Sequence, residues 1–486
     1  MPTAVLERDD IQALVRSGFG KLDGSRLLLV RVKPGEEKAA RRWLGEAHVL
    51  SVAEFEAAHS AGQRIHRVLQ IAITAPGLAA LGVPTEVMGR FPADFLAGIA
   101  SDSKRSQRLG DIGANSPENW KYGRKGDEPH LLLMLYADCG DIEAFVESTV
   151  EGLGQSCEVL TPQLDCGQPG REPFGFADGV SQPRIDWDGE RKPGGTADQV
   201  YTNWVSAGEV LLGYFDEYNL VSDRPLVPAA LAGARGLPPS VDDADLRDLG
   251  RNGSFLVLRT LRQDYDGFWN WAKENGGEDG AQKLAEAVIG RRMDGKPLDG
   301  LGTAEITGLD DSEDNFTYDR DPEGHICPFG GHIRRANPRT GDIPGGGRGL
   351  FHYLMVNLGF WGTVKDDVIA PTRFHRLLRR GRPYGRQGEE QGLHFIALNS
   401  NLTRHFEFIQ NAWLMNPFFA GLANEGDPLT GSREPFPPGI PTDQFTRPRA
   451  EGPCTRYTGL PRFVTVEGGA YFFLPGLRAL RYIARA

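Results

Sequence analysis

Short apolar runs alternate with amphipathic segments along the first third of the chain. Seven- and eight-residue runs rich in Leu, Val and Ile predict strands at 26–32, 67–74 and 130–137. Apolar residues at helical spacing among charged ones predict helices at 35–47 and 141–153, the second capped by Asp141. Proline near each start predicts two short helices within 84–100. A strand–helix–strand unit followed by strand–helix predicts a ferredoxin-like α+β sandwich.

The second half of the chain shows the same pattern. Strands are predicted at 252–264 and 393–401, and helices within 265–293 and at 403–414. The run at 462–476 predicts a hairpin that turns at its Gly-Gly pair. We therefore expect an α+β fold of two ferredoxin-like lobes with antiparallel sheets and peripheral helices, one over residues 1–210 and one over 211–486.

The composition is that of a globular protein with a large core. Of the 486 residues, 40% are hydrophobic and 24% charged, and the net charge of −11 disfavours a nucleic-acid or anionic-membrane partner. The sequence starts without a signal-peptide core or twin-arginine pair, and no stretch of about 18 apolar residues occurs. Five sparse cysteines without a Cys-x-x-Cys pair argue against a disulfide framework or a structural zinc site. We expect a cytoplasmic protein with reduced thiols.

Asp178 lies in an apolar stretch, FGFADGVSQP at 174–183, between Gly175 and Gly179. Asp-Gly is a common turn dipeptide, because glycine adopts positive φ freely and aspartate bonds its own backbone. The stretch by itself therefore favours a turn over a catalytic carboxylate. Ser181 lacks the strained turn of a hydrolase nucleophile, and the chain has no phosphate-binding or dinucleotide-binding glycine motif.

A second stretch, HICPFGGHIRRANPR at 325–339, holds candidate metal ligands. His332 follows two glycines that let a flat ligand approach the backbone, so it is a candidate axial ligand of haem iron. A loop histidine without a ligand is the more common case. His325 stands in a polar context that predicts exposure, and Cys327 is expected to be a buried structural thiol. The spacing of these three residues matches no standard zinc site.

Four arginines gather in a third stretch, HRLLRRGRPYG at 375–385. Most are expected to be solvated. An arginine that points inward from a strand or helix edge needs an anionic partner, because a buried guanidinium is costly to leave unpaired. Asp178 is such a partner.

Together, these three stretches make the chain resemble the dye-decolourising peroxidases, a haem peroxidase family, and in particular its larger subgroup with insertions. The family signature G-x-x-D-G is present as residues 175–179, and the second stretch resembles the segment with the proximal histidine, which corresponds to His332. Arg379, four residues before Pro383, corresponds to the distal arginine. Stretches 392–413 and 463–483 also resemble family sequence.

The resemblance implies one haem b per chain, held between the lobes with His332 on its iron. Asp178 would be the general base that moves a peroxide proton, and Arg379 would stabilise the charge on the departing oxygen. Further contacts to the cofactor would come from Arg335, through a propionate, and from Gly175 and Gly179. The expected activity is oxidation of organic donors such as dyes and phenolics by hydrogen peroxide, through an oxoferryl intermediate.

Some features depart from the family or leave alternatives open. Some members carry an asparagine two residues after the distal arginine, where this chain has Gly381, so that role is not transferred. The separation of 47 positions between His332 and Arg379 predicts an inserted loop beside the access channel. The alternative function is a haem-binding or haem-iron-handling protein with little peroxidase turnover, which would not need Asp178 together with Arg379. A haem-free α+β binding protein would use the first stretch as a turn. The sequence leaves open whether the protein is a monomer or a homodimer.

Overall fold

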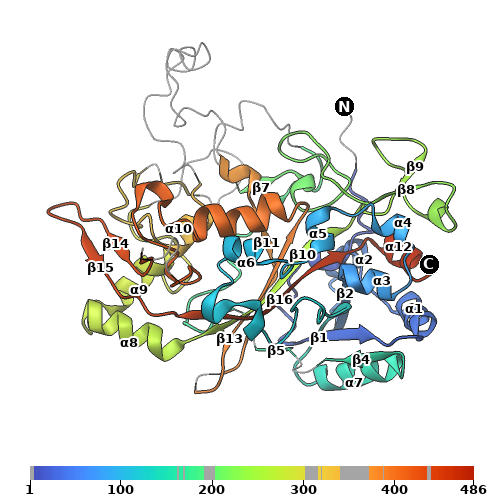
Figure 1. Cartoon of the computed structure of the whole chain (residues 1–486), viewed down its shortest axis with the longest axis horizontal. Helices are drawn as coiled ribbons and strands as arrows, with labels where there is room; N and C mark the ends of the chain where they lie inside the picture. Colours follow the sequence, from blue (N-terminus) through green and yellow to red (C-terminus); the bar gives the residue numbers. More distant parts are fainter. Residues whose placement is uncertain are drawn as a thin grey trace, which may run out of the picture.

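A ten-stranded sheet runs through the centre of the molecule, with helices packed around it (Figure 1). Among the described residues, the strands of this sheet pair antiparallel. The computed structural model describes residues 5–160, 164–167, 170–190, 203–301, 316–318, 320–339, 371–386, 388–434, 439 and 441–485. The loop predicted between His332 and Arg379 falls largely on 340–370, outside the described residues.

The N-terminal lobe is built on β1 (Gly24–Val32), β2 (Arg67–Ile73), β3 (Leu131–Ala137) and β4 (Cys157–Val159), in the spatial order β2-β3-β1-β4. Helices α1 (Glu37–Glu46) and α2 (Val52–Ser60) follow β1, and α7 (Ile142–Leu153) follows β3. This connectivity is ferredoxin-like, as predicted. The predicted cap is wrong: Asp141 stands at the N-cap of α7, but its side chain makes no capping bond, because its backbone is already helical at φ −107° and ψ −13°.

The C-terminal lobe repeats this arrangement with β10 (Ser254–Gln263), β11 (Leu378–Arg379), β13 (Gly392–Asn399) and β16 (Val464–Leu474), in the order β11-β13-β10-β16. Helices α8 (Tyr265–Gly276) and α9 (Ala281–Ile289) follow β10, and a π-helical segment, Thr403–Glu407 and Ile409–Leu414, follows β13. Phe473 of β16 pairs with Ile73 of β2, which joins the two lobes into one sheet. The predicted two-lobed α+β fold is confirmed, and the boundary at 210/211 stays a prediction.

Smaller elements surround the sheet. The helices are α3 (Ala75–Ala80), α4 (Thr85–Met88), α5 (Ala93–Ala97), α6 (Ser103–Leu109), α10 (His332–Ala336) and α12 (Leu477–Ile483). The strands are β5 (Leu164–Cys166), β6 (Arg184–Ile185), β7 (Trp204–Val205), β8 (Leu226–Pro228), β9 (Leu246–Asp248), β12 (Arg382–Tyr384), β14 (Phe445–Arg447) and β15 (Thr455–Tyr457). Within the described part of the chain, no helix has the length and apolar character needed to cross a membrane.

The continuous apolar runs of the sequence are explained by burial of both faces of the sheet. In β1, Leu28 and Val30 pack into one hydrophobic core, while Leu27 and Leu29 pack into another. Successive side chains of a strand point to opposite faces, so a strand that is covered on both sides has no polar alternation.

The predicted hairpin at 462–476 is wrong, because β16 crosses the Gly-Gly pair as one continuous strand. The pairing with β10 shifts register between Thr260 and Leu261, opposite Gly468. A Cβ at Gly468 would lie 2.4 Å from the ring of Tyr122. Glycine inside a strand often marks such an irregularity and a close approach, and here it has that role instead of forming a turn.

Candidate active site

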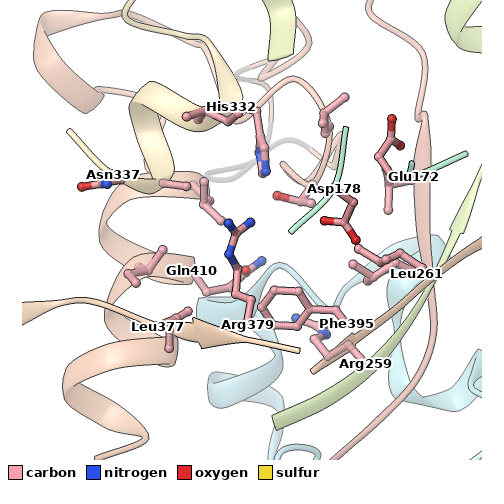
Figure 2. A pocket seen from close by; sticks show the side chains of 18 of the residues that line it. Glu172, Asp178, Arg259, Leu261, His332, Asn337, Leu377, Arg379, Phe395 and Gln410 are labelled. Carbon is pink, nitrogen blue, oxygen red and sulfur yellow. The ribbon is translucent and has the colours of Figure 1, made fainter. Parts of the chain in front are cut away.

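A cavity lined by residues from both predicted lobes brings together residues from all three sequence stretches. Asp178, Gly179, His332 and Arg379 line it, whereas Gly175 and Arg335 do not. Figure 2 shows the His332 imidazole pointing into the cavity on the side opposite the Arg379 guanidinium, with Asp178 beside the space between them. Much of the remaining wall is apolar and includes Leu261, Ile289, Phe395, Phe406, Ile409 and Val464.

His332 is oriented by a carboxylate that lies 95 residues further along the chain. It begins the short helix α10 after Gly331, and its Nδ1 lies 2.9 Å from Oδ2 and 3.1 Å from Oδ1 of Asp427. Asp427 has no exposed side-chain surface. Because Nδ1 is engaged, Nε2 is the ring nitrogen left for a ligand in the cavity.

Asp427 is kept ionised by the groups around it. Burial by itself would raise the pKa of this carboxyl, but His332, the nearby Arg335 and the backbone N–H of Thr430 favour the charged form and lower the pKa to about 2. Its Oδ1 also accepts from the backbone N–H of Leu429, at 3.0 Å. The sequence contained no signal for this residue, since a lone aspartate in a loop matches no motif.

The structure does not bring Arg335 to the cavity. Its side chain is fully buried, and its guanidinium donates to the backbone carbonyls of Trp413, Leu414, Glu425 and Asn416. Arg335 therefore fastens the π-helical segment to the segment before Asp427, and this position does not support the predicted contact with a propionate.

A tight turn presents Asp178 to the cavity. Gly175 and Gly179 have φ of +98° and +78°, a left-handed region that costs a residue with a Cβ about 1–2 kcal/mol. The backbone N–H of Asp178 donates to Gly170 at 3.1 Å, and its Oδ1 accepts from the N–H of Gly179 at 2.6 Å. The chain bends at Gly179, where the Asp-Gly dipeptide predicts a turn, and the N–H of Gly179 fixes one carboxylate oxygen.

Glu172 is a second carboxylate on this wall that the sequence did not reveal. Its two oxygens accept from the backbone N–H groups of Phe174, at 3.0 Å, and Phe176, at 2.9 Å, so it braces the turn that carries Asp178. The side-chain amide of Gln263 donates to it at 2.6 Å. Burial raises the pKa of Glu172, and the negative charge of Asp178 acts in the same direction. The three hydrogen bonds that Glu172 accepts lower its pKa but do not cancel the effect of burial.

Arg379 reaches the cavity from β11, as its strand-edge position predicts. Its backbone N–H donates to the side chain of Gln182 at 2.8 Å, and one guanidinium nitrogen donates to the carbonyl of Val180 at 2.6 Å. The expected ion pair with Asp178 is not formed among the described residues. The carbonyl of Val180 instead holds the guanidinium beside the turn of Asp178, which leaves its other two nitrogens for a ligand.

The other candidate ligands of the second stretch lie away from the cavity. Cys327 is fully buried, and burial raises the pKa of its thiol to about 12, as suits the predicted structural thiol. His325 is half-buried and lies 3.3 Å from Glu323. Within the described ranges, no group of three or more His, Cys, Asp or Glu side chains could hold a metal ion.

The cavity has the donor set that a haem requires. The imidazole of His332 faces it, the walls are mostly apolar, and the cations Arg291 and Arg376 are among its lining residues. The π-helical segment supplies Phe406, Ile409, Gln410 and Leu414 to the same wall. The residues present thus fit an iron porphyrin with carboxylate substituents.

Comparisons with known proteins agree with the resemblance seen in the sequence. No protein-family model matches the chain. A dye-decolorizing peroxidase of Mycetinis scorodonius is 28% identical over 444 residues, covering 85% of this chain and 76% of the relative. A solved dye-decolorizing peroxidase of Auricularia auricula-judae matches with a TM-score of 0.72 and 23% identity, covering 99% of this chain and 100% of that one. A dye-decolorizing peroxidase solved in complex with 2,6-dimethoxyphenol matches with a TM-score of 0.69 and 21% identity, covering 99% and 100%.

Proposed function

We propose that this protein, a relative of the dye-decolourising peroxidases, is a haem peroxidase that uses hydrogen peroxide to oxidise organic donors such as phenolics and dyes. The observation that carries the proposal is the arrangement of three side chains around one cavity. His332, oriented by Asp427, faces it on one side, Arg379 faces it on the opposite side, and Asp178 lies beside the space between them. Simple haem binding would need the first side and not the second.

Bound haem would supply iron that accepts electrons from the donor and passes them to peroxide. We propose haem b, one per chain, which His332 would hold through its iron and Arg291 and Arg376 through its carboxylates. Gly179 would let the turn approach the cofactor closely. Asp427 would keep the His332 imidazole in one orientation and increase its basicity, since a carboxylate partner favours electron donation from the other ring nitrogen.

Asp178 is proposed to move the peroxide proton. Its Oδ1 is fixed by the N–H of Gly179, while Oδ2 accepts no bond from the described residues and can take a proton from one peroxide oxygen and return it to the other. Arg379 would donate to the departing oxygen, where negative charge develops as the O–O bond breaks. The apolar walls would strengthen this interaction by excluding water.

Stopped-flow mixing of the haem-loaded ferric protein with peroxide tests the assignment. We expect a fast change of the Soret band in the wild type. General-base catalysis contributes roughly 10²–10⁴-fold, and loss of one charge-stabilising donor costs roughly 10²–10³-fold, so Asp178→Ala and Arg379→Leu should slow this change by such factors. Arg386→Gln, an exposed arginine near the end of the same stretch, is the matched control. Unchanged rates in the two distal variants would refute their roles, and haem binding without any peroxide reaction would favour the alternative haem-handling function.

The cytoplasmic location and the lobe boundary at 210/211 remain proposals from the sequence. The four cysteines whose side chains are described, Cys139, Cys157, Cys327 and Cys454, are free thiols, which fits a reducing compartment.

A further inference from the structure

Strand β11, which carries Arg379, lies at the edge of the central sheet and pairs there with β13. The N–H of Arg380 donates to the carbonyl of Ile396 in β13 at 2.8 Å. Successive amide groups of a strand point to opposite sides, so the N–H of Arg379 points away from β13. An outward amide on an edge strand needs a partner from outside the sheet. The backbone that positions Arg379 is therefore held on one side by β13 and depends on another segment on the other side.

Gln182, at the end of the first sequence stretch, supplies that partner. Its side-chain Oε1 accepts from the N–H of Arg379 at 2.8 Å, and its Nε2 donates to the carbonyl of Gly179 at 3.4 Å. Two residues before Gln182, the carbonyl of Val180 accepts from the guanidinium of Arg379 at 2.6 Å. The short segment after Asp178 thus holds Arg379 at both ends, at its backbone and at its guanidinium.

This segment is itself anchored to other parts of the site. Ser181 has a φ of +59°, a left-handed conformation that residues with a Cβ rarely adopt and that is frequent at functional sites. Its Oγ accepts from Arg339 of the second stretch at 2.8 Å. The carbonyl of Gln182 accepts from the side chain of Asn203 at 2.6 Å, and Asn203 accepts from Arg376 at 2.5 Å. The segment is therefore a fixed reference against which β11 is placed.

Holding both ends of Arg379 matters for the proposed chemistry. A long side chain has many rotamers, so the guanidinium has a defined place when its backbone is fixed as well as its tip. A donor that stabilises developing charge has to lie about 2.7–3.1 Å from the atom that becomes charged. A shift of β11 away from the Asp178 turn would move the guanidinium out of this range.

We propose that Gln182 is a positioning residue of the peroxide reaction, which fixes the backbone of Arg379 relative to Asp178. This inference rests on the proposed peroxidase function and adds a residue to it. Gln182 moves no proton and acts through Arg379. Loss of its side chain should therefore resemble a partial loss of Arg379, and haem binding through His332 should be unchanged.

Hydrogen–deuterium exchange of the haem-loaded protein, without peroxide, tests the contact itself. Gln182→Met keeps the length of the side chain and removes the acceptor. The amide of Arg379 should then exchange roughly three- to tenfold faster by mass spectrometry at single-residue resolution, as expected for one lost hydrogen bond. Gln182→Glu keeps an oxygen acceptor and should exchange like the wild type. Unchanged exchange in Gln182→Met would overturn the proposal. This readout involves no peroxide, so it is decided independently of the proposed function.

A double-mutant cycle on the stopped-flow peroxide rate tests the route of the effect. Gln182→Met should slow the reaction roughly tenfold, because misplacing a reacting group by about 1 Å can cost about a hundredfold. In the Arg379→Leu background the same change should have almost no further effect, since residues that act through one another are not additive. Equal slowing in both backgrounds would show that Gln182 does not act through Arg379 and would overturn the proposal.

Thr74→Val is the matched control for a general loss of stability. The Thr74 hydroxyl donates to the carbonyl of Pro129 at 2.7 Å and accepts from the N–H of Gly77 at 3.0 Å, and Thr74 does not line the cavity. This variant should lower stability to urea without changing the peroxide rate, and an equal slowing would count against Gln182. If Gln182→Met does not fold, Gln182→Asn, which is one methylene shorter, carries the same expectations. A wild type that does not react with peroxide would refute the proposed function, whereas the exchange result would still decide the contact.

Discussion

Two carboxylates beside the central cavity, Asp427 on the His332 side and Glu172 on the Asp178 side, hold their protons with opposite strength. The pKa of Asp427 is lowered to about 2, whereas the pKa of Glu172 is raised. Burial opposes ionisation of both. Asp427 has His332 and Arg335 as counter-charges, while Glu172 has neutral amide donors and the like charge of Asp178.

The difference shows how the two sides are held. The His332 side is fixed by charge-assisted hydrogen bonds in a buried network, which are shorter and stronger than neutral ones. The Asp178 side is fixed by a backbone turn with neutral donors, which leaves its charged groups free to meet a ligand. A ligand-binding imidazole needs a fixed orientation, and a general base needs an unengaged oxygen.

Among the changes that test this comparison, removing the imidazole of His332 should have the largest effect, which is loss of haem binding. We expect His332→Ala to lose the Soret absorbance of bound haem after reconstitution and gel filtration, because no other described histidine at the cavity has a carboxylate-oriented ring. His325→Ala, in the same stretch and outside the cavity, is the control and should load haem like the wild type. Full haem loading in His332→Ala would show that another residue binds the iron.

Removing the negative charge of Asp427 should have the second-largest effect. Asp427→Asn should lower haem affinity or peroxide reactivity by about 10–100-fold, since loss of a partner that orients a metal ligand typically costs this much. The rate of haem transfer to apomyoglobin would measure haem affinity, and the stopped-flow rate would measure peroxide reactivity. Glu425→Gln alters another buried carboxylate in the same loop that binds Thr446 and does not touch His332, so it should leave both near the wild-type values.

A smaller effect is expected from bending the turn. At Gly179 an added Cβ would meet open space, so Gly179→Ala should cost about 1–2 kcal/mol through its positive φ alone. It should also slow the peroxide reaction, because it shifts Asp178. Gly277→Ala, with φ of +69° and open space between α8 and α9, should cost similar stability without changing the peroxide rate. Equal peroxide kinetics in both variants would show that the backbone conformation at Gly179 does not control the peroxide reaction.

The smallest effect concerns pH. A carboxyl whose pKa is raised on folding keeps its proton in the folded state above pH 4.5, where the unfolded chain has lost it, so stability falls as pH rises through that window. We expect Glu172→Gln to remove this slope, so that its stability relative to wild type improves between about pH 4 and pH 8. Urea unfolding at both pH values would measure the difference in free energy of unfolding between Glu172→Gln and the wild type. Glu278→Gln, on an exposed loop, is the control and should show no such change with pH. A pH-independent difference would show that Glu172 titrates normally.

The long strands and most of the long helices could be read from periodicity, because these strands are apolar runs and these helices carry one apolar stripe, whereas α2 and the strands of two or three residues could not. The prediction of a turn at the Gly-Gly pair of β16 is wrong, because glycine is needed there to make room for the ring of Tyr122, which is more than 300 residues away in the chain. The cap at Asp141 was misread because the sequence does not give the φ and ψ of that residue. Local patterns cannot report such distant or conformational constraints.

For the candidate site, the sequence indicated the side chains that we propose to be reactive, because Asp178, His332 and Arg379 lie in short motifs whose glycines and neighbours are local. The tertiary structure decided which partners these side chains meet. It brought Asp427 next to His332, 95 residues earlier in the chain. It directed the guanidinium of Arg335 toward backbone carbonyls. It also placed the carbonyl of Val180, instead of the carboxylate of Asp178, against Arg379. The physical reason is that a motif fixes residue type and backbone shape, whereas hydrogen-bond partners and charge compensation depend on which distant segments fold against it.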